Sequence, residues 1–306
     1  MEVIKRGGTK ERFSVEKIHK VVEWATNGIN GVSLSDIEMN ANLSIHDGIE
    51  TSKIHQILIK SANDLISTAE PNYQYVAARL LNMQLRKEVW GCADKPREFL
   101  LFLQNNVDNG VYDPELLEKW SEEDIQTLEG HIVHGRDDQF TYAGLQQMID
   151  KYLVKNRSSG RIYETPQFAY MSIAMCLFDD LRDVKEAYDC YSTFKINLPT
   201  PIMAGVRTTI RQFASCVLVD VDDDLDSIFS SVHAVGKYTA RRAGIGLNIG
   251  RMRPINSPIR GGEVIHTGVI PYLKNFESAV KSTSQNGLRG GSATAHIPFW
   301  HYEIED

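Results

Sequence analysis

The stretch that decides the fold is CVLVDVDDDLDSIFSSVHAVGKYTARRAGIGLNIG (216–250). The apolar runs at 216–220 and 245–250 are typical of strands, and the amphipathic pattern of 225–243 between them predicts a helix. A strand, a helix and a strand within about 35 residues make a βαβ unit, whose strands run parallel. The sequence therefore predicts a parallel sheet that binds ligands at the carboxyl ends of its strands.

The last residues, HIPFWHYEIED (296–306), continue the same kind of sequence pattern and contain no element that closes this sheet. An unclosed sheet exposes unpaired strand edges, which proteins normally cover. We therefore expect a fragment that requires a partner.

Before residue 199 the pattern is mainly helical. The first 90 or so residues predict a small domain in which a hairpin lid covers a helical bundle. Its predicted elements are a hairpin at 1–13 that turns at Gly7-Gly8, a helix capped by Ser14, a weaker helix at 34–44, a helix capped by Thr51 or Ser52, and a helix at 73–90. The side chains expected to point inward are Val15, Ile18, Val21, Val22, Ala25, Ile29, Ile54, Leu58 and Leu65.

Residues 95–195 are also helical by pattern, with a strand-like interruption at 151–164. We expect three domains, at 1–92, 93–198 and 199–306. The fold class therefore runs from α+β in the first part to α/β in the last.

Composition excludes several classes of function. A net charge of −7 argues against nucleic acid as a partner, because binding it requires a basic surface. The longest apolar run, 168–178, is about half the ~20 residues that span a bilayer. The charged N-terminus has no signal-peptide core. We expect a cytoplasmic protein with no membrane segment.

The four cysteines lie far apart without a CxxC pair, so neither a zinc ribbon nor a disulfide scaffold is encoded. Cys176, in an apolar helical run, is expected in the core. Cys216, on a strand, is by composition either a buried filler or half of a redox pair. His131 and His134 have no third ligand nearby in sequence, which favours an exposed pair over a metal site.

Basic residues cluster beside the glycine turn of the hairpin: Lys5, Arg6, Lys10, Arg12 and Lys17. Glycines and cations at a helix start can hold a polyphosphate. On these residues alone, a solvated charged surface is favoured.

Two motifs follow the first predicted strand of the βαβ unit. The acidic cluster at 219–227 can cap a helix or accept hydrogen bonds from sugar hydroxyls. The glycines of AGIGLNIG (243–250) have the wrong spacing for a dinucleotide fingerprint and favour a kink where another backbone or a ligand comes close.

Two polar loops complete the set of motifs. Arg251, Arg253 and Arg260 lie in a loop with proline and glycine, where arginines often hold phosphate. The loop at 281–294, KSTSQNGLRGGSAT, is by composition a ligand-sensing loop or a passive linker.

The order of several segments along the chain is more specific than any one of them. These segments are KRGGTKERFSVEKIHKVVEWA (5–25), ETSKIH (50–55), YQYVAARLL (73–81), FKINLPTPIMAGVRT (194–208), RRAGIGLNIGRMR (241–253) and VKSTSQNGLRGGSAT (280–294). Together they resemble the large subunit of the aerobic class I ribonucleotide reductases, over essentially the whole chain. The resemblance implies an N-terminal ATP-cone, a helical domain, and the first strands of a ten-stranded α/β barrel left incomplete.

The resemblance also implies two effector sites. The ATP-cone would sense ATP against dATP, which replaces the solvated-surface interpretation of the basic cluster. The residues that match its nucleotide-binding positions are Lys5, Arg6, Glu11, Arg12, Phe13, Ser14, Val15, Glu16, Lys17, Thr51, His55 and Lys87. The residues that match the specificity-effector site, where a deoxynucleoside triphosphate or ATP selects the substrate, are Asp223, Asp224, Leu225, Arg253 and Arg260. The loop that carries this selection to the substrate would consist of Ser284, Gln285, Asn286, Gly287, Leu288, Arg289 and Gly290.

The implied chemistry is radical. A thiyl radical takes the ribose 3′-hydrogen, water leaves from C2′, and two cysteines reduce the intermediate and end as a disulfide. Cys216 matches one of these two cysteines. Thr200, Ser215 and Gly244 match substrate-contacting positions, with Thr200 at a phosphate.

The departure from the family is large. The Asn-x-Cys-x-Glu segment of the radical cysteine, the second redox cysteine, the radical-transfer tyrosines and a C-terminal cysteine pair are not in the sequence. We therefore expect this chain to be inactive alone and to need a second polypeptide that completes the barrel, whether the large subunit is naturally split or truncated.

The other expected partners are the radical-generating small subunit, which would hold the metal-radical cofactor, and thioredoxin or glutaredoxin as reductant. The assembled protein is expected to self-associate. This chain itself is expected to hold no metal or cofactor apart from its nucleotide effectors with their magnesium.

Two other hypotheses stay open. The first is a stand-alone nucleotide-binding regulatory module, although cones in transcriptional repressors accompany a zinc ribbon that is not encoded here. The second is a decayed remnant without function, against which the intact effector-site residues argue.

Overall fold

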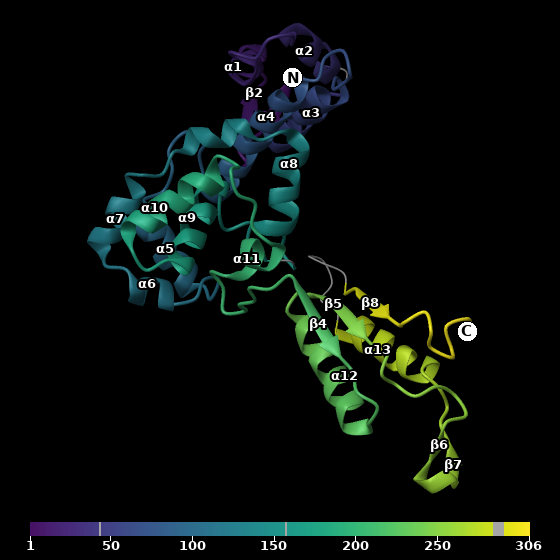
Figure 1. Cartoon of the computed structure of the whole chain (residues 1–306). Helices are drawn as coiled ribbons and strands as arrows, with labels where there is room; N and C mark the ends of the chain where they lie inside the picture. The colour runs from purple at the N-terminus through teal and green to yellow at the C-terminus, as the bar shows by residue number, and fades with distance from the viewer. Residues whose placement is uncertain (43, 157, 284–290) are drawn as a thin grey trace. The chain divides into compact units, whose positions relative to one another are not determined.

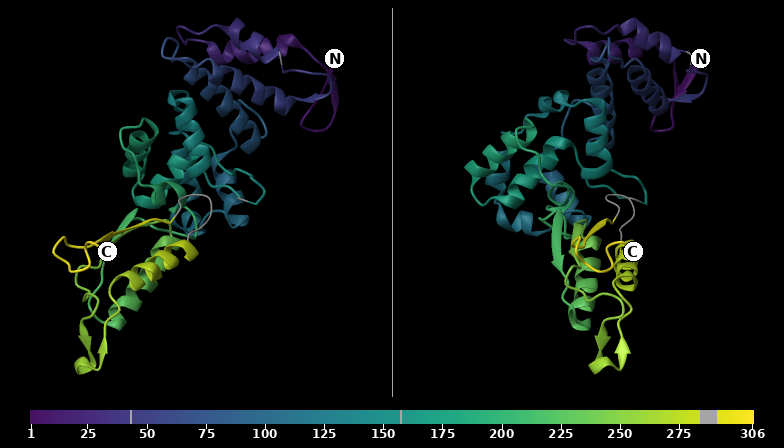
Figure 2. Two further views of the ribbon diagram at one scale, coloured as in Figure 1. Left: turned by 90° about the vertical axis from the view of Figure 1, so that its right-hand side faces the viewer. Right: turned by 45° about the vertical axis from the view of Figure 1, so that its right-hand side comes forward.

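The computed structural model of the chain describes residues 1–42, 44–156, 158–283 and 291–306. The chain forms two compact units, Met1–Asn197 and Leu198–Asp306. Figure 1 labels their elements, and Figure 2 shows them from two further sides.

A small sheet begins the first unit. β1 (Glu2–Ile4) pairs antiparallel with β2 (Lys10–Arg12), and β3 (Ile49–Glu50) runs parallel to β1 on its other side. The turn closes where the Lys5 amide donates to the Thr9 carbonyl at 2.8 Å. Gly8 takes a φ of 81°, a conformation that glycine adopts without steric cost. The predicted hairpin is confirmed.

The same part of the unit contains four helices: α1 (Val15–Thr26), α2 (Leu34–Asn42), α3 (Thr51–Asp64) and α4 (Tyr73–Val89). All four predicted helices are confirmed, but two details are wrong. Val15 is 58% exposed, because the side chain of a first helical residue points back past the start of the helix. Glu50, rather than Thr51 or Ser52, is the N-cap of α3, because β3 delivers the extended backbone that a cap needs.

The rest of the first unit is helical, as predicted. Its α-helices are α5 (Phe99–Asp108), α6 (Glu115–Lys119), α7 (Glu122–Glu129), α8 (Tyr142–Gln147), α9 (Pro166–Leu177) and α10 (Leu181–Ser192). A 3₁₀ turn, η1 (His134–Gln139), and a π turn, η2 (Met148–Tyr152), lie among them. The predicted strand-like interruption is present as one antiparallel bridge between Lys155 and Ile162.

α9 is the central helix of this part, and nearly all its residues are buried. Its Phe168 ring lies 4.6 Å from the ring of Phe102 and 5.0 Å from that of Phe99, between centroids.

In the described ranges, α9 and every other helix fall short of the length and apolar character that crossing a membrane requires.

A buried polar network ties α4 to η1, α9 and α10. Arg86 Nη2 lies 3.1 Å from Asp137 Oδ2, Gln167 Nε2 donates to Asp137 Oδ1 at 2.8 Å, and Tyr188 Oη donates to Gln167 Oε1 at 2.6 Å. Asp137 is 1% exposed, and burial raises its pKa against the opposing charge of Arg86. The network fixes the C-terminal half of α4 in the helical part of the unit.

The second unit contains a parallel sheet. Its elements are α11 (Thr200–Gly205), β4 (Cys216–Asp220), α12 (Leu225–Ala240), β5 (Gly244–Asn248), β6 (Pro258–Ile259), η3 (Arg260–Gly262), β7 (Val264–Ile265), α13 (Ile270–Thr283) and β8 (Ala293–His296). The sheet has the order β4-β5-β8 with every pair parallel, in a register that places Cys216 opposite Gly244. The βαβ unit predicted from 216–250 is confirmed.

The two faces of this sheet differ. On one face, Ile245 and Leu247 of β5 pack with α12 and α13 in a single core, which the figures show as two helices against the strands. On the other face, Leu218 is 85% exposed and Cys216 is also exposed. The interpretation of Cys216 as a buried strand residue is therefore wrong, because nothing in the described part of the chain covers this face.

Gly246 lies in the uncovered face, beside the exposed side chain of Leu218. A Cβ at Gly246 would lie 2.6 Å from Leu218 Cδ2, and one at Gly250 would lie 2.4 Å from Pro298 Cδ. In both cases the neighbour is a side chain, so an approach of another backbone or a ligand at these glycines stays a prediction.

Candidate functional site

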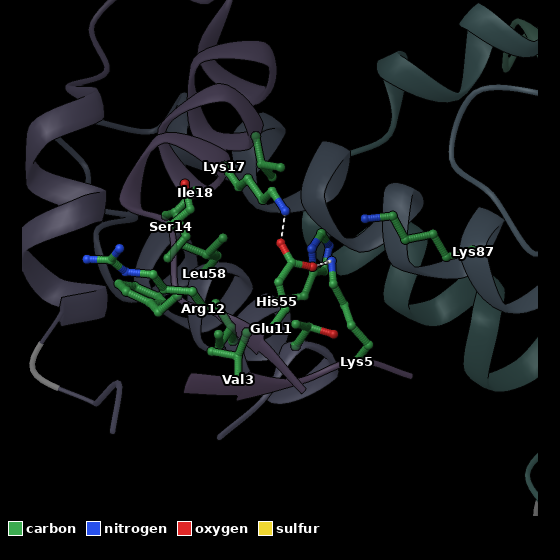
Figure 3. Close-up of a pocket in the computed structure, with 14 residues that line it drawn as sticks. Val3, Lys5, Glu11, Arg12, Ser14, Lys17, Ile18, His55, Leu58 and Lys87 are labelled. Atoms are coloured by element: carbon green, nitrogen blue, oxygen red, sulfur yellow. Dashed lines mark hydrogen bonds and ion pairs between the residues drawn. The ribbon is translucent and has the colours of Figure 1, made fainter. Parts of the chain in front are cut away.

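A pocket of about 170 Å³ opens between the hairpin and the helices of the first unit. Figure 3 shows the side chains around it. They come from β1, β2, the start of α1, the start of α3 and the end of α4, and are Val3, Lys5, Glu11, Arg12, Phe13, Ser14, Lys17, Ile18, Val21, Thr51, Ile54, His55, Leu58 and Lys87. Lys5 and Lys87, more than 80 residues apart in the sequence, therefore line the same pocket.

The charges of this pocket favour an anion. Four of the lining residues are cationic, Lys5, Arg12, Lys17 and Lys87, against the single carboxylate of Glu11. Lys5 Nζ lies 2.8 Å from Glu11 Oε2, and Lys17 forms an ion pair with the other oxygen of the same carboxylate. The carboxylate thus holds two of the ammonium groups in place, and the net charge of the lining stays positive.

His55 forms a neutral, buried part of the wall. It is 6% exposed, and its Nε2 lies 2.7 Å from the Leu80 carbonyl oxygen. Burial, with smaller contributions from the charges of Lys87 and Arg6, lowers the pKa of His55 from 6.5 to about 4. Since a carbonyl only accepts, Nε2 carries the proton and Nδ1 is left as an acceptor.

Crowding of cations also affects Lys87. Burial, followed by the charge of Arg6 and more weakly that of Lys5, lowers the pKa of Lys87, while Asp94 opposes the shift. A phosphate group at this point would relieve the repulsion, because opposite charge favours the protonated ammonium.

The structure brings most of the predicted cone residues together. Those that line the pocket are Lys5, Glu11, Arg12, Phe13, Ser14, Lys17, Thr51, His55 and Lys87. Arg6, Val15 and Glu16 are not in the lining, although the charge of Arg6 reaches His55. The role of each residue in binding a nucleotide stays a prediction.

Sequence reasoning missed the apolar wall of this pocket. Val3, Ile18, Val21, Ile54 and Leu58 line it beside the cations. The helix pattern placed four of these residues inward, but that pattern could not say that they also face a cavity.

A second pocket, of about 310 Å³, lies in the second unit at the start of α12. Its lining consists of Asp223, Asp224, Leu225, Ile228, Arg253, Ile259, His266 and Tyr272. Arg253 Nε lies 2.7 Å from Asp223 Oδ2, and the Arg253 amide donates to Asp223 Oδ1 at 2.8 Å. Asp224 caps α12 by accepting from the Ser227 amide at 2.8 Å. The capping interpretation of the acidic cluster is therefore confirmed at Asp224, whereas an acceptor for sugar hydroxyls at Asp223 stays a prediction.

Two features of this second pocket were not foreseen. The rings of His266 and Tyr272 stack with centroids 5.7 Å apart and 15° between their planes, and both line the pocket. Arg260 is not in the lining; it is exposed, with a φ of 51° at the turn between β6 and β7. Arg251 forms an ion pair with Asp222 at 2.8 Å.

The loop predicted to link effector and substrate lies outside the described residues. This applies to Ser284, Gln285, Asn286, Gly287, Leu288, Arg289 and Gly290. Their predicted role stays a prediction.

The predicted substrate positions lie near one end of the parallel sheet. Cys216 begins β4, and the Ser215 hydroxyl donates to its Sγ at 3.7 Å. The Gly244 amide donates to the Ser215 carbonyl at 2.7 Å, which joins the two strands at this point. Thr200 is the first residue of α11, whose Ala204 carbonyl accepts from Arg242 at 3.2 Å. Ser215, Cys216 and Gly244 thus meet at the start of β4 and β5, whereas the place of Thr200 at a substrate stays a prediction.

The remaining cysteines and histidines require two corrections. Cys176 is half-buried rather than in the core, because it lies in the last turn of α9. His131 and His134 are not an exposed pair. His131 Nε2 lies 3.1 Å from Asp189 Oδ2, and the His134 ring packs 5.1 Å from that of Trp90, where burial lowers its pKa to about 4. Among the described residues, no group of three potential ligands is arranged to hold a metal ion.

Comparison with known sequences finds three matching domains along the chain. Residues 1–88 match the ATP cone domain, residues 138–211 the all-alpha domain of ribonucleotide reductase, and residues 214–306 its barrel domain. The two ribonucleotide reductase matches together cover more than half of the chain.

Curated relatives match nearly the whole chain. The ribonucleoside-diphosphate reductase 1 alpha subunits of Salmonella typhimurium and Escherichia coli are each 50% identical over 309 residues, which cover 99% of this chain and 40% of the relative. The alpha subunit of Enterobacteria phage T4 is 48% identical over 313 residues, which cover 100% of this chain and 41% of the relative. The chain therefore belongs to the ribonucleotide reductase alpha-subunit family, and it spans about 40% of the length of these relatives.

Proposed function

We propose that this chain is the effector-binding part of a ribonucleoside-diphosphate reductase whose barrel is completed by a second chain. In this proposal, ATP or dATP with its magnesium binds in the first-unit pocket, and a deoxynucleoside triphosphate binds in the pocket at α12. The cationic lining of the first pocket is the observation that carries the proposal.

The first pocket offers a separate group for each part of a nucleotide. The ammonium groups of Lys5, Lys17 and Lys87 suit a triphosphate, because charge-assisted hydrogen bonds to phosphate are the strong ones. The apolar wall with Phe13 suits a purine ring. The neutral His55 offers an acceptor at Nδ1, which suits a hydroxyl or an exocyclic amino group.

The second pocket has the polarity that a sugar and phosphates require. Asp223 supplies an acceptor for a ribose hydroxyl, and Arg253 supplies guanidinium donors beside it. The stacked pair of His266 and Tyr272 suits a base. In the proposal, Arg260 also holds phosphate of the effector, and the loop at 284–290 carries the selection to the substrate.

Cys216 is proposed to reduce the substrate. A thiyl radical on the second chain removes the 3′-hydrogen of the ribose, and water leaves from C2′. Cys216 and a further thiol of the second chain then supply two electrons and two protons and become a disulfide, which thioredoxin or glutaredoxin reduces. The cysteine that took the 3′-hydrogen returns it to C3′ and regains its thiyl radical. The exposed thiol of Cys216 beside the Ser215 hydroxyl supports this role.

The remaining parts of the proposal concern the assembly. The family's small subunit is proposed to generate the radical with its own metal cofactor, and the assembled protein is proposed to self-associate in the cytoplasm.

Calorimetric titration of the whole chain with ATP and with dATP tests the first pocket. Lys87→Met and Lys5→Met are each expected to weaken binding about 10- to 100-fold, the typical loss for a charge-assisted hydrogen bond. The matched control is Lys20→Met, on the exposed surface of α1 and away from the pocket lining, which should bind as the unaltered chain does. Equal affinity of all four proteins would contradict the proposed site.

A further inference from the structure

The loop between β5 and α13 contributes three lining residues to the second pocket. They are Arg253, Ile259 and His266, and the adjoining helix α13 adds Tyr272. Within this loop, residues 255–269 form a hairpin whose short strands β6 and β7 pair antiparallel (Figure 1). The shape of the pocket therefore depends on how the two ends of this hairpin are held.

A single buried carboxylate joins those two ends. Glu303 is 5% exposed, and its Oε2 accepts from the Ile255 amide at 2.8 Å and from the Val269 amide at 3.1 Å. The Val269 amide also lies 3.2 Å from Oε1 of the same carboxylate. Hydrogen bonds of this charge-assisted kind are the stronger ones in proteins. Glu303 therefore fixes the base of the hairpin, although it does not itself line the pocket.

The same carboxylate comes very close to the backbone that orients the His266 ring. Gly268 takes a φ of 88°, and a Cβ at this position would collide with Glu303. The Gly268 amide donates to His266 Nδ1 at 3.1 Å, and the ring stacks on that of Tyr272. Because Nδ1 accepts, the proton of a neutral His266 lies on Nε2. The position of this ring in the pocket thus depends on the contact between Glu303 and Gly268.

His301 supports the start of the loop. It is 8% exposed, and its Nε2 lies 2.9 Å from the carbonyl oxygen of Met252, the residue before Arg253. Its Nδ1 accepts from the Glu303 amide at 3.2 Å. Arg253 in turn bonds to Asp223 through its amide and its Nε. His301 therefore fixes the backbone ahead of Arg253 and orients Glu303 as well.

We propose that Glu303 and His301 are positioning residues of the effector pocket at α12. Neither residue lines the pocket, and each acts on the effector through a neighbour, His301 through Arg253 and Glu303 through His266. The inference rests on the proposed function of the second pocket. It goes further because it assigns to two buried residues a role in binding that the pocket lining does not reveal.

The polar character of this contact favours positioning over simple packing. Apolar cores tolerate exchange of their side chains and lose a unique arrangement before they lose stability. A satisfied buried polar network instead specifies one geometry. A binding site requires such precision, since its groups must be held within about 0.5 Å of the productive arrangement by the residues behind them. Glu303 and His301 reach specified backbone atoms on both sides of the loop, which meets this requirement.

Calorimetric titration of the whole chain with dTTP tests the role of Glu303. Glu303→Ala is expected to bind dTTP about 10-fold or more weakly, because it releases both ends of the hairpin. Glu303→Gln keeps one acceptor oxygen and should recover part of the affinity. The matched control is Glu305→Ala, the same change at an exposed glutamate of the same segment, which should bind as the unaltered chain does.

A double-mutant cycle distinguishes positioning from a general loss of structure. If Glu303 acts through His266, then Glu303→Ala should weaken dTTP binding much less in a chain that already carries His266→Ala. A merely structural role would weaken binding by the same factor in both backgrounds. Circular dichroism and the melting temperature of each variant verify that the chain is folded.

His301 is tested by the same titration. His301→Ala releases the Met252 carbonyl and should weaken dTTP binding about 5-fold or more. His301→Gln can still donate to that carbonyl and should retain more of the affinity. His46→Ala makes the same substitution at an exposed histidine of the first unit and should leave dTTP binding unchanged.

The outcomes separate this inference from the proposed function. If the unaltered chain binds dTTP and the variants at Glu303 and His301 bind it equally well, the positioning role is wrong and the effector pocket stands. Equal losses in both backgrounds of the cycle would likewise overturn the role of Glu303. If the unaltered chain does not bind dTTP, or if Arg253→Met binds it as tightly as the unaltered chain, the proposed second site is wrong and the inference falls with it.

Discussion

At the residue scale, the surroundings of a side chain decide its chemical state. His55 and His134 are both half or more buried, and both have a pKa lowered from 6.5 to about 4. The sequence placed His55 at a nucleotide site by resemblance alone. The sequence did not indicate that the His55 imidazole is neutral. Its protonation depends on burial and on the charges of Arg6 and Lys87, which only folding brings near it.

The pH dependence of stability follows from His55. Between about pH 4 and pH 6.5 the unfolded chain binds a proton at this residue and the folded chain does not. The free energy of unfolding is therefore expected to be unaffected by His55 above pH 6.5 and to fall on acidification toward pH 4, by up to about 3 kcal/mol. Urea unfolding followed by circular dichroism at several pH values measures this change.

The matched variants are His55→Gln and His233→Gln. Glutamine at position 55 can still donate to the Leu80 carbonyl but does not titrate, so part of the acid sensitivity should disappear. His233→Gln makes the same substitution at an exposed histidine of α12. Identical curves for the unaltered chain and for His55→Gln would show that this residue does not set the dependence.

At the scale of an element, helix α4 has two roles that its sequence pattern did not separate. Its Lys87 lines the first pocket, and the neighbouring Arg86 points into the network around Asp137. The periodicity of 73–90 predicted the helix, because apolar residues recur on it at helical spacing. The partner of Arg86 lies 51 residues further on, and no local pattern connects the two.

Breaking the Arg86–Asp137 pair should destabilise the first unit. Arg86→Met leaves the Asp137 carboxylate buried without its counter-charge, which costs about 3–5 kcal/mol in such cases. Since burial already raises the pKa of Asp137, the variant can take up a proton there, and the loss should be smaller at pH 5 than at pH 8. Chemical denaturation at the two pH values measures both effects.

Two further variants serve as controls for the stability of Arg86→Met. Adding Asp137→Asn to Arg86→Met removes the buried charge and should restore part of the stability and abolish its pH dependence. Arg182→Met removes an exposed arginine and should leave stability unchanged. If Arg86→Met proved as stable as the unaltered chain, the buried network would not fix α4.

At the scale of the whole molecule, the main feature is the parallel sheet of the second unit, which has one uncovered face. The βαβ pattern at 216–250 predicted parallel strands, and the sheet order β4-β5-β8 confirms them. The resemblance further implied an incomplete barrel, which agrees with the barrel-domain match over 214–306. The uncovered face with Cys216 and Leu218 is the structural consequence.

Activity should depend on assembly. The chain with a family small subunit and thioredoxin alone is expected to form no deoxyribonucleotide, and addition of the remaining alpha-subunit portion should restore product. Thiol mapping after turnover should then find Cys216 in a disulfide with the second chain. Product formed without the added portion, or a disulfide of Cys216 within these 306 residues, would be inconsistent with the proposed function.

The sequence by itself determined the secondary structure, the parallel βαβ unit and the family, because these depend on local periodicity and on the order of short motifs. It did not determine that Cys216 is exposed, that Arg260 lies outside the second pocket, or that His266 and Tyr272 stack inside it. The tertiary structure alone decided these points. Exposure and contact depend on which distant segments meet, and a single sequence records the apolar character of a residue but not what packs against it.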